Sequence, residues 1–417
     1  MKLNLKLAVS LAVAVSIAGA GTLHAAGFAL YEWSARGVAM GGAVMANKAE
    51  PASLAANPAL ITQLEGTQAQ VGFTLVNVSG NATVGTQQRA IENDTFFIPN
   101  AYFTSKISDN VFLGIGLFSR FGLGATYQNY KTWVGSMMAY SALLETFSAN
   151  PNIAVKINED LSLAMGLEVM TLSFKEKKYA PASLFGMPGD LTLEGDSISW
   201  GGNFGAYYNP SWADKWAAAL TYRTKANHIV SGKVTTSGAF AHPMIMDIPS
   251  GHGTAPLTLP DSVSFGISNK PIEELVVEIN VTGTFWSSYK TLRVDYNDSN
   301  ISLIEPKNFK DTIRIALGAE YSLTENWDLR AGYTFDESPI NPKYMDTLIP
   351  AHDRNIFSFG AGYKMNNWGV DLGYSYLKAS DLKGKSAPSP IPYINSVNVS
   401  YEDGSSHIIA LSFKYAF

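Results

Sequence analysis

The chain has 417 residues, of which 16% are charged and 12% are aromatic, and its formal net charge is -5. Ordinary globular proteins carry about 25% charged residues, so the composition argues against a soluble fold. The absence of cysteine excludes a disulfide framework, a thiolate metal site and a cysteine nucleophile. The acidic balance provides no basic field that could hold nucleic acid.

Residues 1–25 have the layout of a secretory signal peptide. Lys2 and Lys6 give a positive start, an uncharged apolar stretch follows, and Ala25 closes the segment with a small residue. The apolar stretch is too short to span a bilayer as a helix. We therefore expect residues 1–25 to be removed when the chain is exported.

The rest of the sequence predicts strands rather than membrane helices. After residue 26, no uncharged apolar run approaches the roughly 18 residues that a transmembrane helix needs. Apolar and polar side chains alternate instead, so that Leu411 and Phe413 share one face while Ser412 and Lys414 share the other. This alternation, with Trp and Tyr near the ends of the apolar faces, is typical of a transmembrane β-barrel.

We predict an all-β antiparallel barrel of about 14 strands, an even number as in bacterial single-chain barrels. The predicted strands are 68–79, 97–107, 111–121, 151–158, 161–175, 197–209, 215–230, 259–269, 273–287, 311–321, 326–336, 354–363, 367–377 and 405–417. The long connections 122–150, 176–196, 231–258, 288–310, 337–353 and 378–404 are expected on the extracellular side. The inward charges Arg314, Glu320, Arg330 and Asp371 are expected to form a cross-strand network rather than a catalytic set.

The segment before the first strand is expected to lie inside the barrel. Residues 26–66 are rich in Ala and Gly and carry few charges, whereas a periplasmic tail would be more polar. A barrel of 14 strands leaves a lumen unless something fills it. We therefore predict a plug over 26–66 inside a barrel formed by 67–417.

Several short motifs then occur in the order found in one known family. They are Ala26-Gly27-Phe28, Asn57-Pro58-Ala59-Leu60, Ser119-Arg120-Phe121-Gly122-Leu123, Asp353-Arg354 and Tyr415-Ala416-Phe417. This ordered set, spread over the whole mature chain, resembles the FadL/TodX family of outer-membrane transporters for hydrophobic compounds. The resemblance implies passive uptake of long-chain fatty acids, or of aromatic hydrocarbons as the alternative. It also implies an outer-membrane monomer that meets its ligand, lipid, lipopolysaccharide and the barrel assembly machinery, with no cofactor.

The resemblance also implies roles for individual residues. Phe28, Asn57, Pro58 and Ala59 would hold or gate the plug. Ser119, Arg120, Phe121 and Gly122 would line a lateral opening where the third strand kinks inward. Without the resemblance, the Asn-Pro-Ala motif indicates a simple turn, and Gly122 indicates close packing at a strand end. Both of these interpretations stay open.

Two further features suggest ligand contacts. Trp133, Met137, Tyr140, Leu144 and Phe147 recur at steps of four and three, which predicts one apolar stripe on a helix. That helix would be a capture groove, a lid over the barrel mouth, or both. Lys178 is the candidate partner of a ligand carboxylate, because a buried anion needs a cation and the family resemblance suggests a basic residue there, with Lys175, Lys177 and Lys307 as substitutes.

Three other classes of protein fit the sequence less well. An outer-membrane lipid hydrolase needs a partnered histidine, but His228, His242, His252, His352 and His407 lack nucleophile-elbow or metal-ligand spacing and are expected to be solvated. A general diffusion porin conflicts with a plug and apolar loops. An energised receptor needs about 22 strands.

Overall fold

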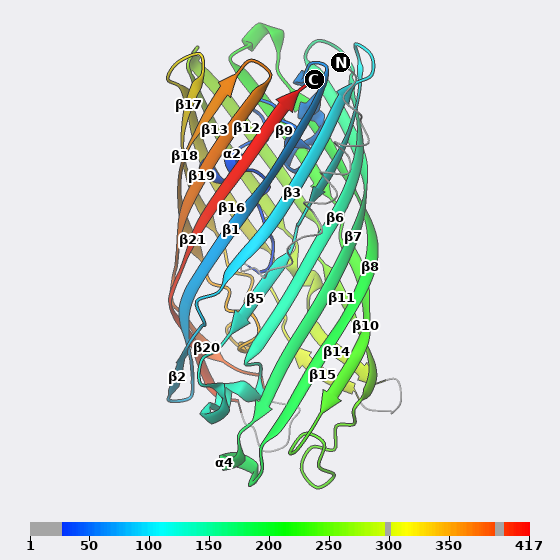
Figure 1. The fold of residues 1–417 in the computed structure, drawn as a ribbon, viewed down its shortest axis with the longest axis vertical. Helices are drawn as coiled ribbons and strands as arrows, with labels where there is room; N and C mark the ends of the chain where they lie inside the picture. The colour runs from blue at the N-terminus through cyan, green and yellow to red at the C-terminus, as the bar shows by residue number, and fades with distance from the viewer. Residues whose placement is uncertain (1–26, 297–301, 388–395) are drawn as a thin grey trace.

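The computed structural model describes residues 27–296, 302–387 and 396–417, and the expected signal peptide lies outside the described residues. Its strands form one closed antiparallel barrel (Figure 1). The barrel closes at β1 (Thr67–Val84), which pairs on one edge with β3 (Thr95–Lys106) and on the other with β21 (Asn398–Ala416). None of the helices among the described residues is long and apolar enough to cross a membrane.

Fourteen spans make up the wall in the described part of the chain, which confirms the predicted fold. Eight spans are single strands: β1, β3, β6 (Ser141–Lys156), β7 (Leu161–Ala180), β8 (Gly189–Tyr208), β17 (Trp327–Asp336), β18 (Arg354–Met365) and β21. The other six consist of two strands in line: β4 (Val111–Phe118) with β5 (Gly122–Thr126), β9 (Trp216–Arg223) with β10 (Ala226–Thr236), β11 (Gly251–Leu259) with β12 (Ser262–Ile272), β13 (Leu275–Thr284) with β14 (Thr291–Tyr296), β15 (Ser302–Pro306) with β16 (Thr312–Ser322), and β19 (Trp368–Ala379) with β20 (Leu382–Lys385). A short strand, β2 (Gln87–Ala90), extends β1 as a hairpin.

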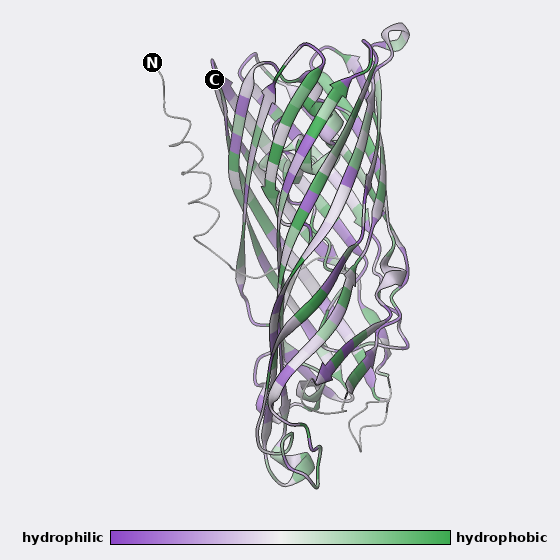
Figure 2. Ribbon diagram, turned by 90° about the vertical axis from the view of Figure 1, so that its right-hand side faces the viewer, coloured by the Kyte–Doolittle hydropathy of each residue, from purple (hydrophilic) through white to green (hydrophobic). Residues whose placement is uncertain are grey.

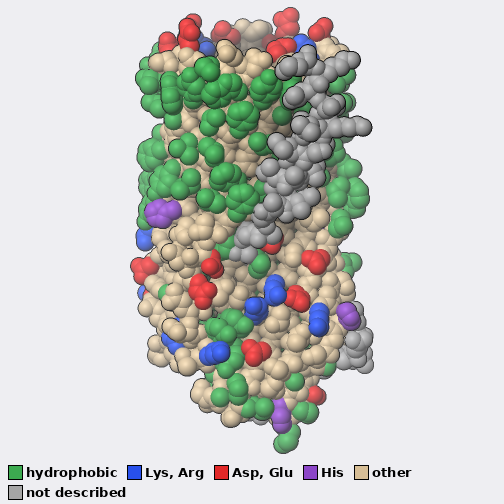
Figure 3. Space-filling model, viewed as in Figure 1, with side chains coloured by type: hydrophobic (Ala, Val, Ile, Leu, Met, Phe, Trp, Pro, Cys, Tyr) green, Lys and Arg blue, Asp and Glu red, His purple; other side chains and the backbone are tan. Residues whose placement is uncertain are grey.

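The outer surface is divided into two zones. On β21, Leu411 and Phe413 are exposed on the outside, whereas Ala410 and Ser412 are buried toward the lumen. Such outward apolar side chains gather on one half of the wall, and charged side chains are scattered over the half that holds the long connections (Figure 3). Hydrophobic and hydrophilic residues alternate along the strands (Figure 2). The apolar half is the band that faces lipid, and the wall continues beyond it.

The expected extracellular loops are shorter than the sequence suggested, because five of the six contain strand residues, including β20 and the start of β21 within 378–404. β7 and β8 continue into 176–196, β10 and β11 into 231–258, and β14 and β15 occupy part of 288–310. Within 122–150, β5 and most of β6 are wall strands. Outside the bilayer an outward side chain need not be apolar, so the alternation that marks the membrane strands is lost there.

The N-terminal segment (residues 27–66) lies within the barrel near the end where the C-terminus lies (Figure 1). It contains α2 (Ala35–Ala39), α3 (Ser53–Ala56) and the 3-10 helix η1 (Pro58–Gln63), and most of its side chains are buried. Wall glycines allow the close contact. A Cβ at Gly373 would lie 2.3 Å from the Ala35 carbonyl oxygen, and one at Gly360 would lie 2.4 Å from the Ala39 Cβ.

Candidate functional site

The third span of the wall is interrupted at residues 119–121, the strand break. β4 pairs with both β3 and β6, but β5 pairs with β6, and the ladder between β3 and β4 ends at the Ala101–Leu117 pair. Beyond that pair, the described residues contain no ladder between β3 and β5. Unpaired backbone groups are costly in lipid, so a barrel wall is normally continuous here.

The N-terminal segment covers the strand break from inside. Leu30 donates its backbone N–H to the Arg120 carbonyl at 2.8 Å, and Gly122 donates to the Phe28 carbonyl at 2.8 Å. The hydroxyl of Thr146 donates to the Phe121 carbonyl at 2.7 Å. These backbone groups of the interruption are therefore satisfied by the N-terminal segment and by a side chain of β6 rather than by β3.

Phe28 anchors this contact with its ring. The side chain is 1% exposed, and its centroid lies 4.6 Å from that of Trp286, 5.8 Å from Tyr289 and 6.2 Å from Phe121. The preceding residue, Gly27, has φ +52°, and a Cβ there would lie 2.5 Å from the Trp286 ring. Only glycine fits this position, which brings the start of the described chain against the aromatic side chains.

A buried ion pair lies behind the strand break. Arg120 donates to Glu168 at 2.7 Å, Arg223 lies 3.8 Å from the same carboxylate, and all three side chains are at most 6% exposed. Arg120 also sits 5.1 Å from the ring centroid of Phe121. A cavity of about 40 Å³ adjoins Arg120, Phe121 and Ala29. It has room for a little water, so a hydrophobic ligand can enter here only if side chains move.

Asn57 joins the N-terminal segment to the wall. Its Oδ1 accepts from Ala59 N–H at 3.1 Å and so caps η1, in which Pro58 is the first residue. Its Nδ2 donates to the Met45 carbonyl at 3.0 Å and to the Ala206 carbonyl of β8 at 3.1 Å. The Asn-Pro-Ala motif is therefore more than a turn, because the buried side-chain amide of Asn57 caps η1 and also joins the N-terminal segment to β8.

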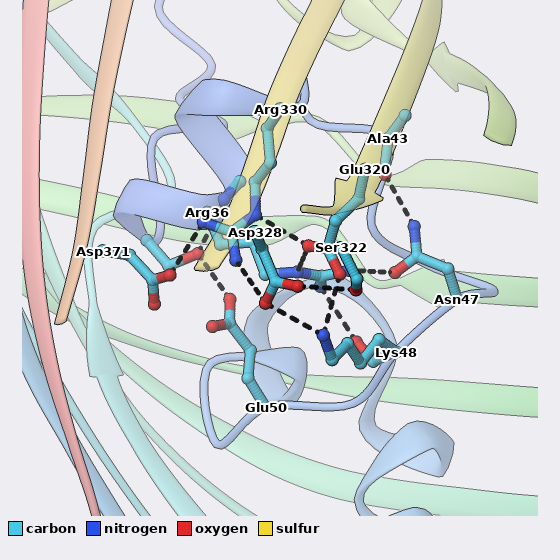
Figure 4. A network of polar contacts seen from close by, with 12 residues as sticks. Arg36, Ala43, Asn47, Lys48, Glu50, Glu320, Ser322, Asp328, Arg330 and Asp371 are labelled. Atoms are coloured by element: carbon cyan, nitrogen blue, oxygen red, sulfur yellow. Dashed lines mark hydrogen bonds and ion pairs between the residues drawn. The ribbon is translucent and has the colours of Figure 1, made fainter. Parts of the chain in front are cut away.

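The predicted cross-strand network of inward charges is confirmed for three of its four members (Figure 4). Arg330 donates to Glu320 and to Asp371, each at 2.7 Å. The sequence did not reveal that the N-terminal segment completes it. Arg36 donates to Glu320 at 2.7 Å, and Lys48 contacts the same carboxylate at 3.1 Å.

The expected helix over 133–147 is wrong. Trp133 and Met137 lie at the short 3-10 helix η3 (Val134–Met137), whereas Leu144 and Phe147 belong to β6. Side chains of a strand alternate, so Leu144 is buried in the lumen and Phe147 faces outward. Steps of three and four also fit a strand that is apolar on both faces, which is why the spacing misled.

The structure nevertheless brings three of these residues together. Trp133, Met137 and Leu144 belong to one apolar cluster of buried side chains that also includes Phe28 and Phe121. Other members are Tyr127, Phe240, Trp286, Tyr289, Tyr296, Phe309 and Tyr401. Tyr140 is not a member of this cluster; it is half-buried, and its ring stacks 3.8 Å from that of Tyr130.

Lys178 is buried and already has partners. Its Nζ contacts Glu305 and lies 3.2 Å from Glu176 Oε1. Burial would lower the pKa of Lys178, but these two carboxylates outweigh that effect and raise it. The lysine is therefore charged and neutralised by the protein itself, an arrangement that the sequence did not reveal because Lys178 and Glu305 lie on distant strands.

Two histidines are not solvated as expected. His228 is 2% exposed on β10 and its Nδ1 lies 2.8 Å from Ser197 Oγ, while its Nε2 has no partner among the described residues. The acid of a catalytic triad is therefore missing from this pair. His352 is 6% exposed, and its Nδ1 lies 2.7 Å from the Ser380 carbonyl. In the described ranges, no group of three or more His, Asp or Glu side chains could hold a metal ion.

Comparison with known proteins identifies the family. The model of the outer membrane protein transport protein family (OMPP1/FadL/TodX) matches residues 16–417. The chain belongs to this family. It is 27% identical to the long-chain fatty acid transport protein of Salmonella typhi over 98% of both chains. The OMPP1/FadL/TodX family accordingly places the protein in the bacterial outer membrane.

Solved structures of the OMPP1/FadL/TodX family share this fold. A FadL homologue of Pseudomonas aeruginosa superimposes with a TM-score of 0.85 at 18% identity, covering 94% of this chain and 100% of that one. The P. putida toluene transporter TodX gives 0.73 at 18% identity, covering 93% and 99%. The named family members are transporters or channels and not enzymes.

Proposed function

We propose that this protein carries hydrophobic small molecules passively across the outer membrane, with long-chain fatty acids as the first candidates and aromatic hydrocarbons as the alternative. The observation that carries the proposal is the strand break at 119–121, which the N-terminal segment covers and which adjoins the apolar cluster. A hydrophobic ligand gains about 25 cal/mol for each Å² of apolar surface removed from water, so an apolar path is favourable where an aqueous pore is not. The fatty acid transporter of Salmonella typhi, similar over nearly its whole length, supports this choice of ligand.

The route has three steps. Trp133, Met137, Tyr140, Leu144 and the other loop aromatics receive the ligand at the extracellular end. The ligand then displaces Phe28, and the N-terminal segment acts as a plug that is held by Asn57, Pro58 and Ala59. Ser119, Arg120, Phe121 and Gly122 line a lateral exit into the membrane.

The remaining assignments complete the proposal. Residues 1–25 act as a cleaved signal peptide, 26–66 as the plug and 67–417 as the barrel. The protein works as a monomer without cofactor or catalysis, in contact with lipid and lipopolysaccharide, and reaches the membrane through the barrel assembly machinery. Incomplete triad geometry at His228 argues against the lipid hydrolase.

Uptake should distinguish this protein from a porin. Bacterial cells that lack their own fatty acid transporter should take up radiolabelled palmitate at least tenfold faster when they produce this chain. Liposomes that contain the purified protein should not swell in small sugars, because the N-terminal segment and the apolar cluster occupy the lumen. Swelling comparable to that given by a porin, with no gain in palmitate uptake, would contradict the proposed function.

The lateral exit can be tested at Ser119. Ser119 is 6% exposed, and its carbonyl accepts from Trp33 Nε1 at 3.1 Å. An S119R substitution introduces a long charged side chain into the strand break and should reduce palmitate uptake at least tenfold. Ser173, exposed on the outer face of β7, provides the matched control, and S173R should leave uptake within twofold of the unmodified protein. Equal uptake by both variants would exclude exit through the break.

A further inference from the structure

A cluster of charges, the lysine cluster, lies where β7, β15 and the connection between β17 and β18 meet. It consists of Glu176, Lys178, Glu305, Lys307 and Asp346. Lys307 contacts Asp346 and Glu305, the latter at 2.9 Å, and Glu305 contacts both lysines. Lys178 and Lys307 are 2% and 1% exposed. No cation of this cluster is left for a ligand unless a protein carboxylate moves away.

The lysine cluster adjoins the apolar cluster. Lys307 donates its backbone N–H to the Lys290 carbonyl, and Phe309 donates to the Tyr289 carbonyl. The ring of Phe309 lies 5.1 Å from that of Tyr289, which contacts Phe28 in turn. A ligand that reaches Phe28 through the apolar cluster therefore passes close to these charges.

Carboxylates outnumber lysines in the lysine cluster by three to two. Burial would raise the pKa of Glu305, but Lys178 and Lys307 outweigh it and hold that pKa at about 2. Burial raises the pKa of Glu176 to about 7, above that of an ordinary carboxyl. The cluster is thus neutral or negative near neutral pH, so it offers no net positive charge to an anionic head group.

Other buried cations along the lumen are paired in the same way. Arg120 contacts Glu168 at 2.7 Å, and Arg354 contacts Asp336 at 2.5 Å. Burial lowers the pKa of His352, so this imidazole is neutral. Of the cations named here, each that is charged has a carboxylate partner.

Among the described residues, the lumen also contains neutral hydrogen-bond donors that lack an acceptor. The hydroxyls of Tyr127, Tyr296 and Tyr401 are buried and have no hydrogen-bond partner among the described residues. Tyr127 and Tyr401 are fully buried, and burial followed by the neighbouring Asp346 raises the pKa of Tyr127, so its phenol stays protonated. An unsatisfied buried hydroxyl is unfavourable, and a ligand oxygen that accepts a hydrogen bond would relieve it.

We propose that this protein takes its ligand in an uncharged form, with the polar end of the ligand accepting hydrogen bonds from the hydroxyls of Tyr127 and Tyr401. This rests on the proposed function and specifies its substrate class: protonated fatty acids and neutral long-chain alcohols or esters. Both lysines of the lysine cluster are already paired with protein carboxylates, so neither is free to pair with a ligand carboxylate. The apolar cluster accommodates the hydrocarbon chain of the ligand.

Binding at pH 9 tests the charge preference, because hexadecanoic acid is then in its anionic form. Radiolabelled 1-hexadecanol, hexadecanoate and hexadecane are equilibrated with the purified mature protein in detergent. The alcohol should bind at least tenfold more tightly than hexadecanoate. Equal or tighter binding of hexadecanoate would overturn this inference and leave the proposed function intact, whereas no binding of any of the three would overturn the proposed function itself.

Variants separate the two parts of the inference. Y401F removes one donor without changing shape and should weaken hexadecanol binding about three- to tenfold while leaving hexadecane unaffected, as expected for one neutral hydrogen bond. Y321F, on the exposed outer face of β16, is the matched control. A double E176Q/E305Q variant removes two carboxylates and should strengthen hexadecanoate binding at least tenfold. An unchanged alcohol affinity in Y401F would overturn the hydroxyl contact, and an unchanged hexadecanoate affinity in the double variant would overturn the role of the lysine cluster.

Discussion

Replacing Glu320 with alanine should release the N-terminal segment from the wall while the barrel stays closed. Glu320 is 3% exposed and accepts from Arg36 and Arg330, each at 2.7 Å, and from Lys48 at 3.1 Å. Its removal leaves two buried guanidinium groups without this carboxylate, and breaking a buried ion pair costs about 3–5 kcal/mol. The cost falls on the contact between the segment and the wall, because the barrel ladders are unchanged.

Hydrogen exchange followed by mass spectrometry measures this effect. Amides of residues 35–50 should exchange at least a hundredfold faster in E320A, while those of β17 to β19 keep their protection. E325A, in the exposed turn between β16 and β17, is the control and should match the unmodified protein. Unchanged protection of residues 35–50 in E320A would show that Arg36 and Lys48 do not hold the segment.

Replacing Phe28 with alanine should open the strand break from within. The ring is 1% exposed and packs against Trp286, Tyr289 and Phe121. Truncation of a buried Phe to Ala costs about 3–5 kcal/mol, and the space it leaves adjoins the existing cavity beside Phe121. The two backbone hydrogen bonds that join Leu30 to Arg120 and Phe28 to Gly122 then lose the side-chain packing that stabilises them.

The chain contains no cysteine, so a single introduced thiol reports on the break without background. In a S119C protein, a lipid-soluble maleimide should react at least tenfold faster when Phe28 is alanine. F357A, which truncates a lipid-facing ring on β18, is the control and should leave the labelling rate unchanged. Equal rates in all three proteins would mean that Phe28 does not close the break.

The sequence predicted most clearly what the bilayer enforces. Residues 405–417 alternate strictly because one face of β21 meets lipid, and the same constraint gave the number of spans. Where the wall leaves the lipid, as in β10, β11 and β14, that constraint ends and strands were mistaken for loops. The first part of β6, residues 141–150, was also missed, because Leu144 and Phe147 are apolar on opposite faces of one strand.

The candidate site was less predictable because it depends on contacts between distant segments. The inward charges Glu320 and Arg330 were expected to pair, yet their contact with Arg36 requires the N-terminal segment to lie in the lumen. The pairing of Lys178 with Glu305 likewise appears only when β7 and β15 are brought together. A charged residue at an inward position of a predicted strand indicates a buried ion pair, but the sequence alone does not identify the residue with which it pairs.

The two attachments of the N-terminal segment lie at different depths, with Phe28 at the strand break and Arg36 in the ion network. A cargo molecule that dislodges the first attachment need not disturb the second. Under the proposed function, only the residues near Phe28 would then move, while the remainder of the N-terminal segment would stay bound to the wall. Such a partial displacement would admit an apolar ligand and keep the lumen closed to hydrophilic solutes.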